Sequence, residues 1–216
     1  MPVVPSPRAL IDLADVKGYL PNVLDGDTSY DDVLQDLINA ESREIHRDAG
    51  REFVTAGAGP RLFDVDDEIA YNEQLEICDA TSVTLVQLLN PDGTLIYAAA
   101  AGSWVALPRN REEWEPIRRL WFRCDLNTSV TLYAGMVVRV TAEWGFPEVP
   151  EDVKHACKVF VARDFLKDLA RHSRSARSLS NDEQAALGRD LRKALDTIGW
   201  YRRGRGGRTV QMKATP

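Results

Sequence analysis

The sequence predicts an α+β fold: a small bundle of about four helices with an antiparallel β section inserted between the second and third helices. Apolar residues recur at three- and four-residue steps before residue 50 and after residue 150. Between these segments, short β-type runs alternate with turn residues. We therefore expect residues 1–53 and 146–199 to form the helical core, residues 54–145 a β-rich insertion, and residues 200–216 a basic extended tail.

The chain begins with a proline-rich segment and a short helix. Residues 1–9 hold three prolines and are expected to form an extended arm that is mobile when free. Asp12 is placed to cap a helix that runs through Leu20. The proline that follows Leu20 predicts the end of this helix.

The second predicted helix runs from Ser29 to Gly50. The Ser29 hydroxyl is expected to accept a hydrogen bond from the Asp32 amide, and Gly50 is expected to end the helix. His46 lies beside the apolar stripe and is expected at the surface or at its boundary. The buried stripe consists of Val33, Leu34, Leu37, Ile38, Ile45 and Ala49, and the outer face of Asp36, Glu41, Arg43, Glu44 and Arg47.

The β-rich insertion contains six candidate strands. They lie at residues 61–65, 75–78, 82–89, 94–98, 120–124 and 136–144. The sequence Asn-Pro-Asp-Gly at residues 90–93 is a strong tight-turn signal, so residues 82–98 are expected to form a hairpin. Alternation in the last run predicts a strand with one buried face, and residues 109–119 read as a charged linker.

Four tryptophans fall in or beside this insertion: Trp104, Trp114, Trp121 and Trp144. Aromatic side chains on a β layer more often fill its core or anchor a protein interface than form a carbohydrate platform. A carbohydrate-binding tail accessory protein is therefore a third-ranked interpretation of the chain.

The third helix is expected to start after Pro150, where two acidic residues favour a helix N-terminus. It has one stripe of Val153, Ala156, Cys157 and Phe160 and a second of Val159, Ala162, Leu166 and Leu169, so it is expected to be sandwiched. The fourth helix is expected from a capping box of Ser180 and Glu183 to about Ile198, with Gly199 ending it. Its expected buried side consists of Leu187, Leu191, Ala194, Leu195 and Ile198.

Charge is unevenly divided along the 216 residues. Residues 1–150 hold 12 Lys and Arg against 25 Asp and Glu, a net charge of −13, whereas residues 151–216 hold 15 against 8, a net charge of +7. An acidic body with a basic end suits head-to-tail association or docking on an acidic partner. The basic tail also leaves nucleic-acid binding open, as the runner-up interpretation.

The sequence lacks the common signatures of catalysis and of metal binding. There is no phosphate-binding loop, no G-x-S-x-G elbow and no HExxH motif. The three cysteines, Cys78, Cys124 and Cys157, are far apart and are expected to be free thiols in a reducing compartment. We expect no enzyme activity, no cofactor and no metal site, and neither a membrane span nor a signal peptide.

Two stretches at the flanks of the β section stand out by their order and spacing. The first begins LADVKGYL and continues, after a Gly/Asp-rich loop, as YDDVLQDLINAESREIHRDAGREF. The second reads VTAEWGFPEVPEDVKHACKVFVARDFL, a strand, a Trp-Gly turn and an Ala-rich helix with a "VPEDV" start. In their order and spacing these stretches, about 75 residues together, resemble the tailed-phage head–tail connector family, the head-completion adaptors. The long section of residues 54–135 departs from shorter relatives of the family.

The resemblance implies a structural virion protein. Such adaptors form rings of about twelve subunits beneath the portal, bind the portal and a downstream tail-completion or connector protein, and continue the DNA channel without sequence-specific binding. It also implies location at the capsid–tail junction after assembly in the cytoplasm of a bacterial host. By the same likeness, the portal-docking residues are expected to be Trp200, Tyr201, Arg202, Arg203, Arg205 and Arg208.

Overall fold

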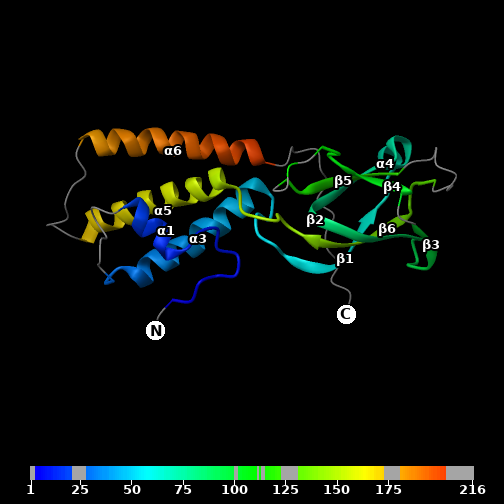
Figure 1. The fold of residues 1–216 in the computed structure, drawn as a ribbon, viewed down its shortest axis with the longest axis horizontal. Coiled ribbons are helices and arrows are strands. Elements are labelled where there is room, and N and C mark those ends of the chain that lie inside the picture. The colour runs from blue at the N-terminus through cyan, green and yellow to red at the C-terminus, as the bar shows by residue number, and fades with distance from the viewer. Residues whose placement is uncertain are drawn as a thin grey trace. The chain divides into compact units, whose positions relative to one another are not determined.

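The computed structural model describes residues 3–20, 28–99, 102–110, 112, 115–122, 131–172 and 181–202. These residues form two compact units (Figure 1). Residues 3–54 and 149–202 make up a helical unit, and residues 55–148 make up a sheet unit. The predicted α+β class, with an antiparallel sheet section between helices, is confirmed.

Four helices form the helical unit: α1 (Leu13–Tyr19), α3 (Asp31–Ala49), α5 (Glu151–His172) and α6 (Asn181–Tyr201), counted over the described residues. Asp12 caps α1 as predicted, because its carboxylate accepts from the Asp15 amide while Asp15 bonds back to the Asp12 amide. Gly50 ends α3 in the left-handed conformation, also as predicted.

The predicted Ser29 cap of α3 is wrong. The N-cap residue is Tyr30, which makes no side-chain capping hydrogen bond. The Asp32 carboxylate instead accepts from the amide of Val3 at 3.0 Å. The first turn of α3 therefore uses its acidic side chain to hold another segment of the chain.

The segment before α1 lies along α3 and is held by side chains of that helix. Asn39 accepts from the Ser6 amide at 2.8 Å and donates to the Val4 carbonyl at 3.1 Å. Ser42 accepts from the Leu10 amide at 3.1 Å, and His46 Nε2 donates to the Arg8 carbonyl at 3.1 Å. His46 is buried, which corrects its predicted position at the surface or at its boundary.

Helix α5 is sandwiched, as its two apolar stripes predict. It contacts α1, α3 and α6. Val153, Ala156, Val159 and Ala162 are fully buried, and so is Phe165, which neither predicted stripe includes. Since α5 has buried residues all round, it forms the centre of the helical unit.

The sheet unit contains one six-stranded antiparallel sheet among its described residues. The order of the strands is β1-β6-β2-β5-β4, and β3 pairs with β2. The strands are β1 (Gly57–Asp64), β2 (Gln74–Leu89), β3 (Leu95–Ala99), β4 (Trp104–Leu107), β5 (Ile117–Phe122) and β6 (Val137–Trp144), and a short helix, α4 (Asp67–Asn72), lies between β1 and β2.

The β2–β3 hairpin and the alternation of β6 are as predicted. Gly93 has φ +85°, and its amide donates to the Asn90 carbonyl at 2.8 Å, which closes the turn. In β6, Val138, Val140 and Ala142 are buried while Glu143 is exposed. The buried side of β6 belongs to the core of the sheet unit.

Three expectations for the insertion are wrong in detail. The runs at 75–78 and 82–89 form one bent strand, β2, whose pairing with β5 and β6 is interrupted by register shifts. Strand β4 and helix α4 are not among the predicted elements. The expected linker 109–119 includes the start of β5, where Ile117 is buried.

Candidate functional site

The end of α6 carries the described part of the predicted docking site. Helix α6 continues through Gly199 to Tyr201, three residues beyond the predicted end at Ile198. Trp200 is 77% exposed, and Arg202, the next described residue after the helix, is also exposed. An exposed indole beside a guanidinium group provides an apolar anchor and a partner for a carboxylate.

Tyr201 has a different environment from its two neighbours. Its side chain is buried, and its hydroxyl donates to Asp152 Oδ1 of α5 at 3.2 Å. Its ring packs edge-on against Phe53, and the Arg51 guanidinium lies 5.8 Å from the ring centroid. Tyr201 therefore fixes the end of α6 to the rest of the helical unit.

Of the six residues predicted for docking, the structure describes Trp200, Tyr201 and Arg202. Arg203, Arg205 and Arg208 lie outside the described residues. The described three are adjacent in sequence, but only Trp200 and Arg202 are exposed to solvent.

The burial of Tyr201 has a signal in the sequence. Ala194, Ile198 and Tyr201 follow one another at steps of four and three, which continues the buried stripe of α6. Leu195 does not belong to this stripe and is 56% exposed, which corrects its predicted burial. The predicted helix ends at Ile198, so the predicted buried stripe of α6 does not include Tyr201.

A charged cluster joins α3 to α5 inside the helical unit. Glu41, predicted on the outer face, is buried, and its carboxylate lies 3.6 Å from Arg163 Nη2. Arg163 also donates two hydrogen bonds to Asp164, at 2.6 and 2.8 Å. Burial and the neighbouring Asp164 raise the pKa of Glu41 to about 7, whereas the Arg163 hydrogen bonds hold the pKa of Asp164 well below its usual range.

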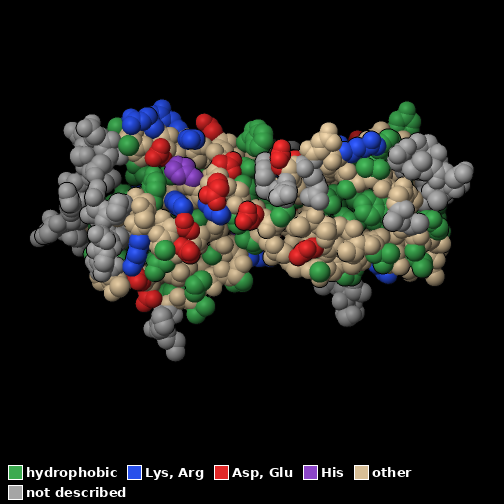
Figure 2. All heavy atoms as spheres, in the orientation of Figure 1, with side chains coloured by type: hydrophobic (Ala, Val, Ile, Leu, Met, Phe, Trp, Pro, Cys, Tyr) green, Lys and Arg blue, Asp and Glu red, His purple; other side chains and the backbone are tan. Residues whose placement is uncertain are grey.

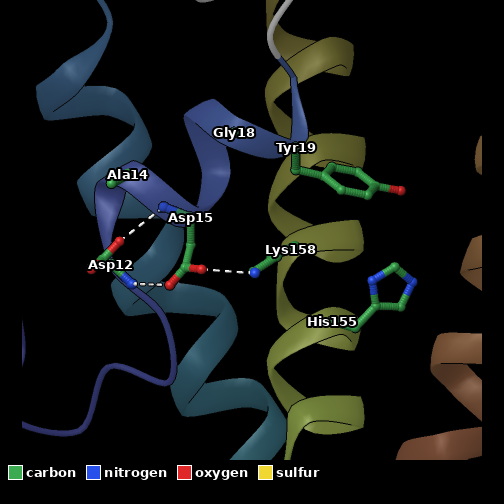
Figure 3. Close-up of a pocket in the computed structure, with 7 residues that line it drawn as sticks. All are labelled: Asp12, Ala14, Asp15, Gly18, Tyr19, His155 and Lys158. Carbon is green, nitrogen blue, oxygen red and sulfur yellow. Dashed lines mark hydrogen bonds and ion pairs between the residues drawn. The ribbon is translucent and has the colours of Figure 1, made fainter.

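A depression of about 510 Å³ is lined by residues of α1 and α5. Figure 3 shows these residues. Lys158 Nζ lies 2.7 Å from Asp15, and this hydrogen bond lowers the pKa of Asp15. The Tyr19 hydroxyl donates to Asp190 of α6 at 3.0 Å. Burial and this bond raise the pKa of Tyr19 to about 12. The charged groups of the depression thus connect helices to one another.

Trp144 of the sheet unit is buried and donates from its indole nitrogen to the Gly59 carbonyl at 2.8 Å. Trp104 and Trp121 are half-buried, and Trp114 lies outside the described residues.

Burial raises the pKa of the Cys157 thiol to about 12. Cys78 is half-buried, and Cys124 lies outside the described residues. Within the described ranges, no group of His, Cys, Asp and Glu is placed to hold a metal, and no helix is long and apolar enough to cross a membrane.

Comparison with solved structures shows what this fold is similar to. A chain from the neck of an empty gene transfer agent particle, computed with C6 symmetry, matches with a TM-score of 0.53 at 17% identity. A chain from the virion of the native gene transfer agent particle matches with a TM-score of 0.50 at 15% identity. Both matches cover 96% of this chain and 98% of the other. No protein-family model and no curated protein sequence matches the chain.

Proposed function

We propose that this chain is a structural protein of the neck of a phage-like particle, an adaptor that joins the DNA-filled head to the tail. The observation that carries the proposal is the fold match over 96% of the chain to a protein in a gene transfer agent neck. The connector-like sequence stretches comprise α1, α3 and most of α5 of the helical unit and the end of β6 of the sheet unit. The proposal assigns the chain a structural role and not a catalytic one.

In this role, copies of the chain form a ring, of about twelve subunits by likeness to the connector family, and the DNA passes through its centre. The net charge of −13 over residues 1–150 supports such a passage, because carboxylates repel duplex phosphates and so prevent tight binding. A downstream tail protein binds the other side of the ring.

The docking site for the portal is the end of α6 together with the basic segment that follows it. Trp200 supplies the anchor, and Arg202, Arg203, Arg205 and Arg208 pair with carboxylates of the portal. Tyr201 does not contact the portal in this proposal. Its buried ring and its hydrogen bond to Asp152 fix the end of α6, which carries Trp200.

The test separates docking from folding. A chain that ends at Arg202 keeps Tyr201 and loses only the residues from 203 onward, and Trp200→Ala removes the exposed anchor alone. Both variants are expected to fold normally and to leave filled heads without tails in the cells that produce the particle. Normal numbers of tailed particles with both variants would refute the docking site.

The same shortened chain decides between docking and nucleic-acid binding. If the basic C-terminal segment binds DNA, the full-length chain should bind duplex DNA with an affinity that falls steeply with salt, and the shortened chain should lose that binding. If the basic C-terminal segment docks on the portal, the two chains should bind DNA equally weakly. They should then differ only in whether the tail of the particle attaches to the head. A strong, salt-dependent loss of DNA binding would favour the nucleic-acid interpretation.

A further inference from the structure

Two helices of the helical unit, α3 and α6, present exposed faces that point away from its centre. Each of them buries its other face against α5. Figure 1 shows α5 between the two, with α6 along one side of the unit and the start of α3 on the other. The outer faces of α3 and α6 therefore lie on opposite sides of the helical unit.

The first half of α3 exposes apolar and acidic side chains together. Val33 is 44% exposed, and Leu37, one turn later, is half-buried. Asp32 and Asp36 flank this pair, and both are exposed. Residues three or four positions apart lie side by side on a helix, so these side chains form one patch. We call it the acidic face, and it consists of Asp32, Val33, Asp36, Leu37 and Ala40.

The negative charge of the acidic face is not balanced within its own helix. Residues 31–42 contain no Lys or Arg. In the second half of α3, two cations, Arg43 and Arg47, are matched by two carboxylates. Arg47 pairs with both of these carboxylates, with Glu44 at 2.8 Å and with Asp48 at 3.5 Å. The exposed negative charge of α3 therefore belongs to its first half.

The exposed side of α6 has the opposite charge. Over residues 184–201 its exposed charged residues are three cations and one carboxylate: Arg189, Arg192, Lys193 and Asp196. The other carboxylate of this range, Asp190, accepts a hydrogen bond from Tyr19. Leu195 lies among the exposed residues and is itself 56% exposed. We call Leu195 and the four charged residues the basic face, and Figure 2 shows Lys and Arg side chains gathered over α6.

The basic face and the acidic face are complementary. Each combines an exposed apolar side chain with charges, and the net charges have opposite signs. Such complementarity steers two protein surfaces together and fixes their register. The basic face suits a protein partner better than DNA, because Leu195 offers phosphates nothing and the Asp196 carboxylate repels them.

We propose that the basic face of α6 in one copy packs against the acidic face of α3 in the next copy, with Leu195 on Val33 and Arg192 paired with Asp36. The two faces are different and lie on opposite sides of one unit. The contact is therefore head-to-tail, and contacts of this kind can repeat around a closed ring. This inference names a subunit interface of the ring and so rests on the proposed function.

The test reverses one charge on each face in the full-length chain. Arg192→Glu alters the basic face and Asp36→Lys alters the acidic face, and both positions are exposed, so both variants are expected to fold. In either variant alone, like charges meet at every contact, and the copies are expected to associate at least about tenfold more weakly. Native mass spectrometry counts the subunits in solution, electron microscopy counts them on particle heads, and circular dichroism verifies folding.

A mixture of the two variants is the sharper test. When Arg192→Glu and Asp36→Lys copies alternate, each contact again joins opposite charges. An equimolar mixture is therefore expected to form rings with an even number of subunits and equal amounts of the two variants. A chain that carries both substitutions is also expected to form rings, because the introduced charges attract one another across each contact.

Leu195→Ala tests the apolar part of the contact. The side chain is mostly exposed in a single copy, so its loss should weaken association about tenfold while the chain still folds. Tyr71→Ala, which removes an 88% exposed side chain of the sheet unit, is the matched control and should leave ring formation unchanged. Glu143→Lys, at an exposed position of the sheet unit, is the matched control for the charge reversals.

The possible outcomes distinguish the interface from the neck role. Normal rings from both Arg192→Glu and Asp36→Lys would overturn the interface and leave the neck role intact, and so would an equal loss of rings in Glu143→Lys. Weaker DNA binding by Arg192→Glu, with normal rings from both variants, would assign the basic face to nucleic acid instead. Variants that lose the ring yet still yield tailed particles would refute the neck role and support the interface. A wild-type chain that forms no ring, in solution or on particle heads, would refute both.

Discussion

The hydroxyl of Tyr201, at the end of α6, donates a hydrogen bond to the carboxylate of Asp152, in the first turn of α5, over 3.2 Å. Because the tyrosine ring is buried as well, its truncation leaves a cavity and removes one hydrogen bond to the Asp152 carboxylate. Tyr201→Ala is expected to lower the free energy of unfolding by about 3 kcal/mol. Tyr201→Phe keeps the ring and is expected to cost about 1 kcal/mol. Urea unfolding of the purified chain measures both.

The neighbouring Trp200 is the control for this prediction. Its side chain is 77% exposed, so Trp200→Ala is expected to change the free energy of unfolding by less than about 0.5 kcal/mol. A larger loss of unfolding free energy in Trp200→Ala than in Tyr201→Ala would contradict the assignment of Tyr201 as the buried side chain that stabilises the end of α6.

The sequence predicts the end of α6 poorly for a physical reason. A glycine after an apolar stripe commonly ends a helix, so Gly199 predicts an end of α6 at Ile198. Glycine within a helix costs only about 1 kcal/mol relative to alanine. The burial of Tyr201 and its bond to Asp152 outweigh that cost, and neither contact is visible in the local pattern.

The fold class is predictable because it rests on local periodicity, whereas the polar contacts are not. The apolar stripes of α3 and α5 and the turn at Gly93 are properties of neighbouring residues. Glu41 and His46 look like surface residues in the sequence, and both are buried by segments far away along the chain. Such burial depends on tertiary contacts that no short window contains.

Glu41 makes the stability of the helical unit depend on pH. The pKa of its folded form, about 7, lies above the ordinary value of 4.5. Its contribution to stability is therefore full below about pH 4.5 and is lost as the pH rises through about 7. Glu41→Gln, which stays neutral, is expected to be more stable than the wild type at about pH 8, by on the order of 1 kcal/mol.

The depressed pKa of Asp164 acts in the opposite direction, and its contribution is lost only as the pH falls below its ordinary value of 3.8. Unfolding measured between about pH 5 and pH 8 therefore reports on Glu41 with little contribution from Asp164. Asp36→Asn, at an exposed position of the same helix, is the control and should keep the wild-type pH dependence. An unchanged pH dependence in Glu41→Gln would show that Glu41 is ionised throughout.

Phe160 tests whether α5 is the centre of the helical unit. Its side chain is 6% exposed, and the Arg163 guanidinium lies 5.4 Å from the ring centroid. Phe160→Ala is expected to cost about 3–5 kcal/mol in the free energy of unfolding, because it leaves a cavity in a packed core. Leu166→Ala, at a half-buried position of the same helix, should cost clearly less. A loss below about 1 kcal/mol for Phe160→Ala would contradict the sandwiched position.

Asn39 tests whether the N-terminal segment is fixed to α3. Its side chain accepts from the Ser6 amide and donates to the Val4 carbonyl, so it holds two backbone groups of the segment at once. Asn39→Ala is expected to expose the Ser6 amide to solvent and to raise its hydrogen-exchange rate. Asn39→Asp keeps the acceptor and loses the donor, so the Ser6 amide should remain protected while the contact to Val4 is lost. Equal exchange of the Ser6 amide in the wild type and in Asn39→Ala would show that the other contacts of the segment, through Asp32, Ser42 and His46, suffice to hold it.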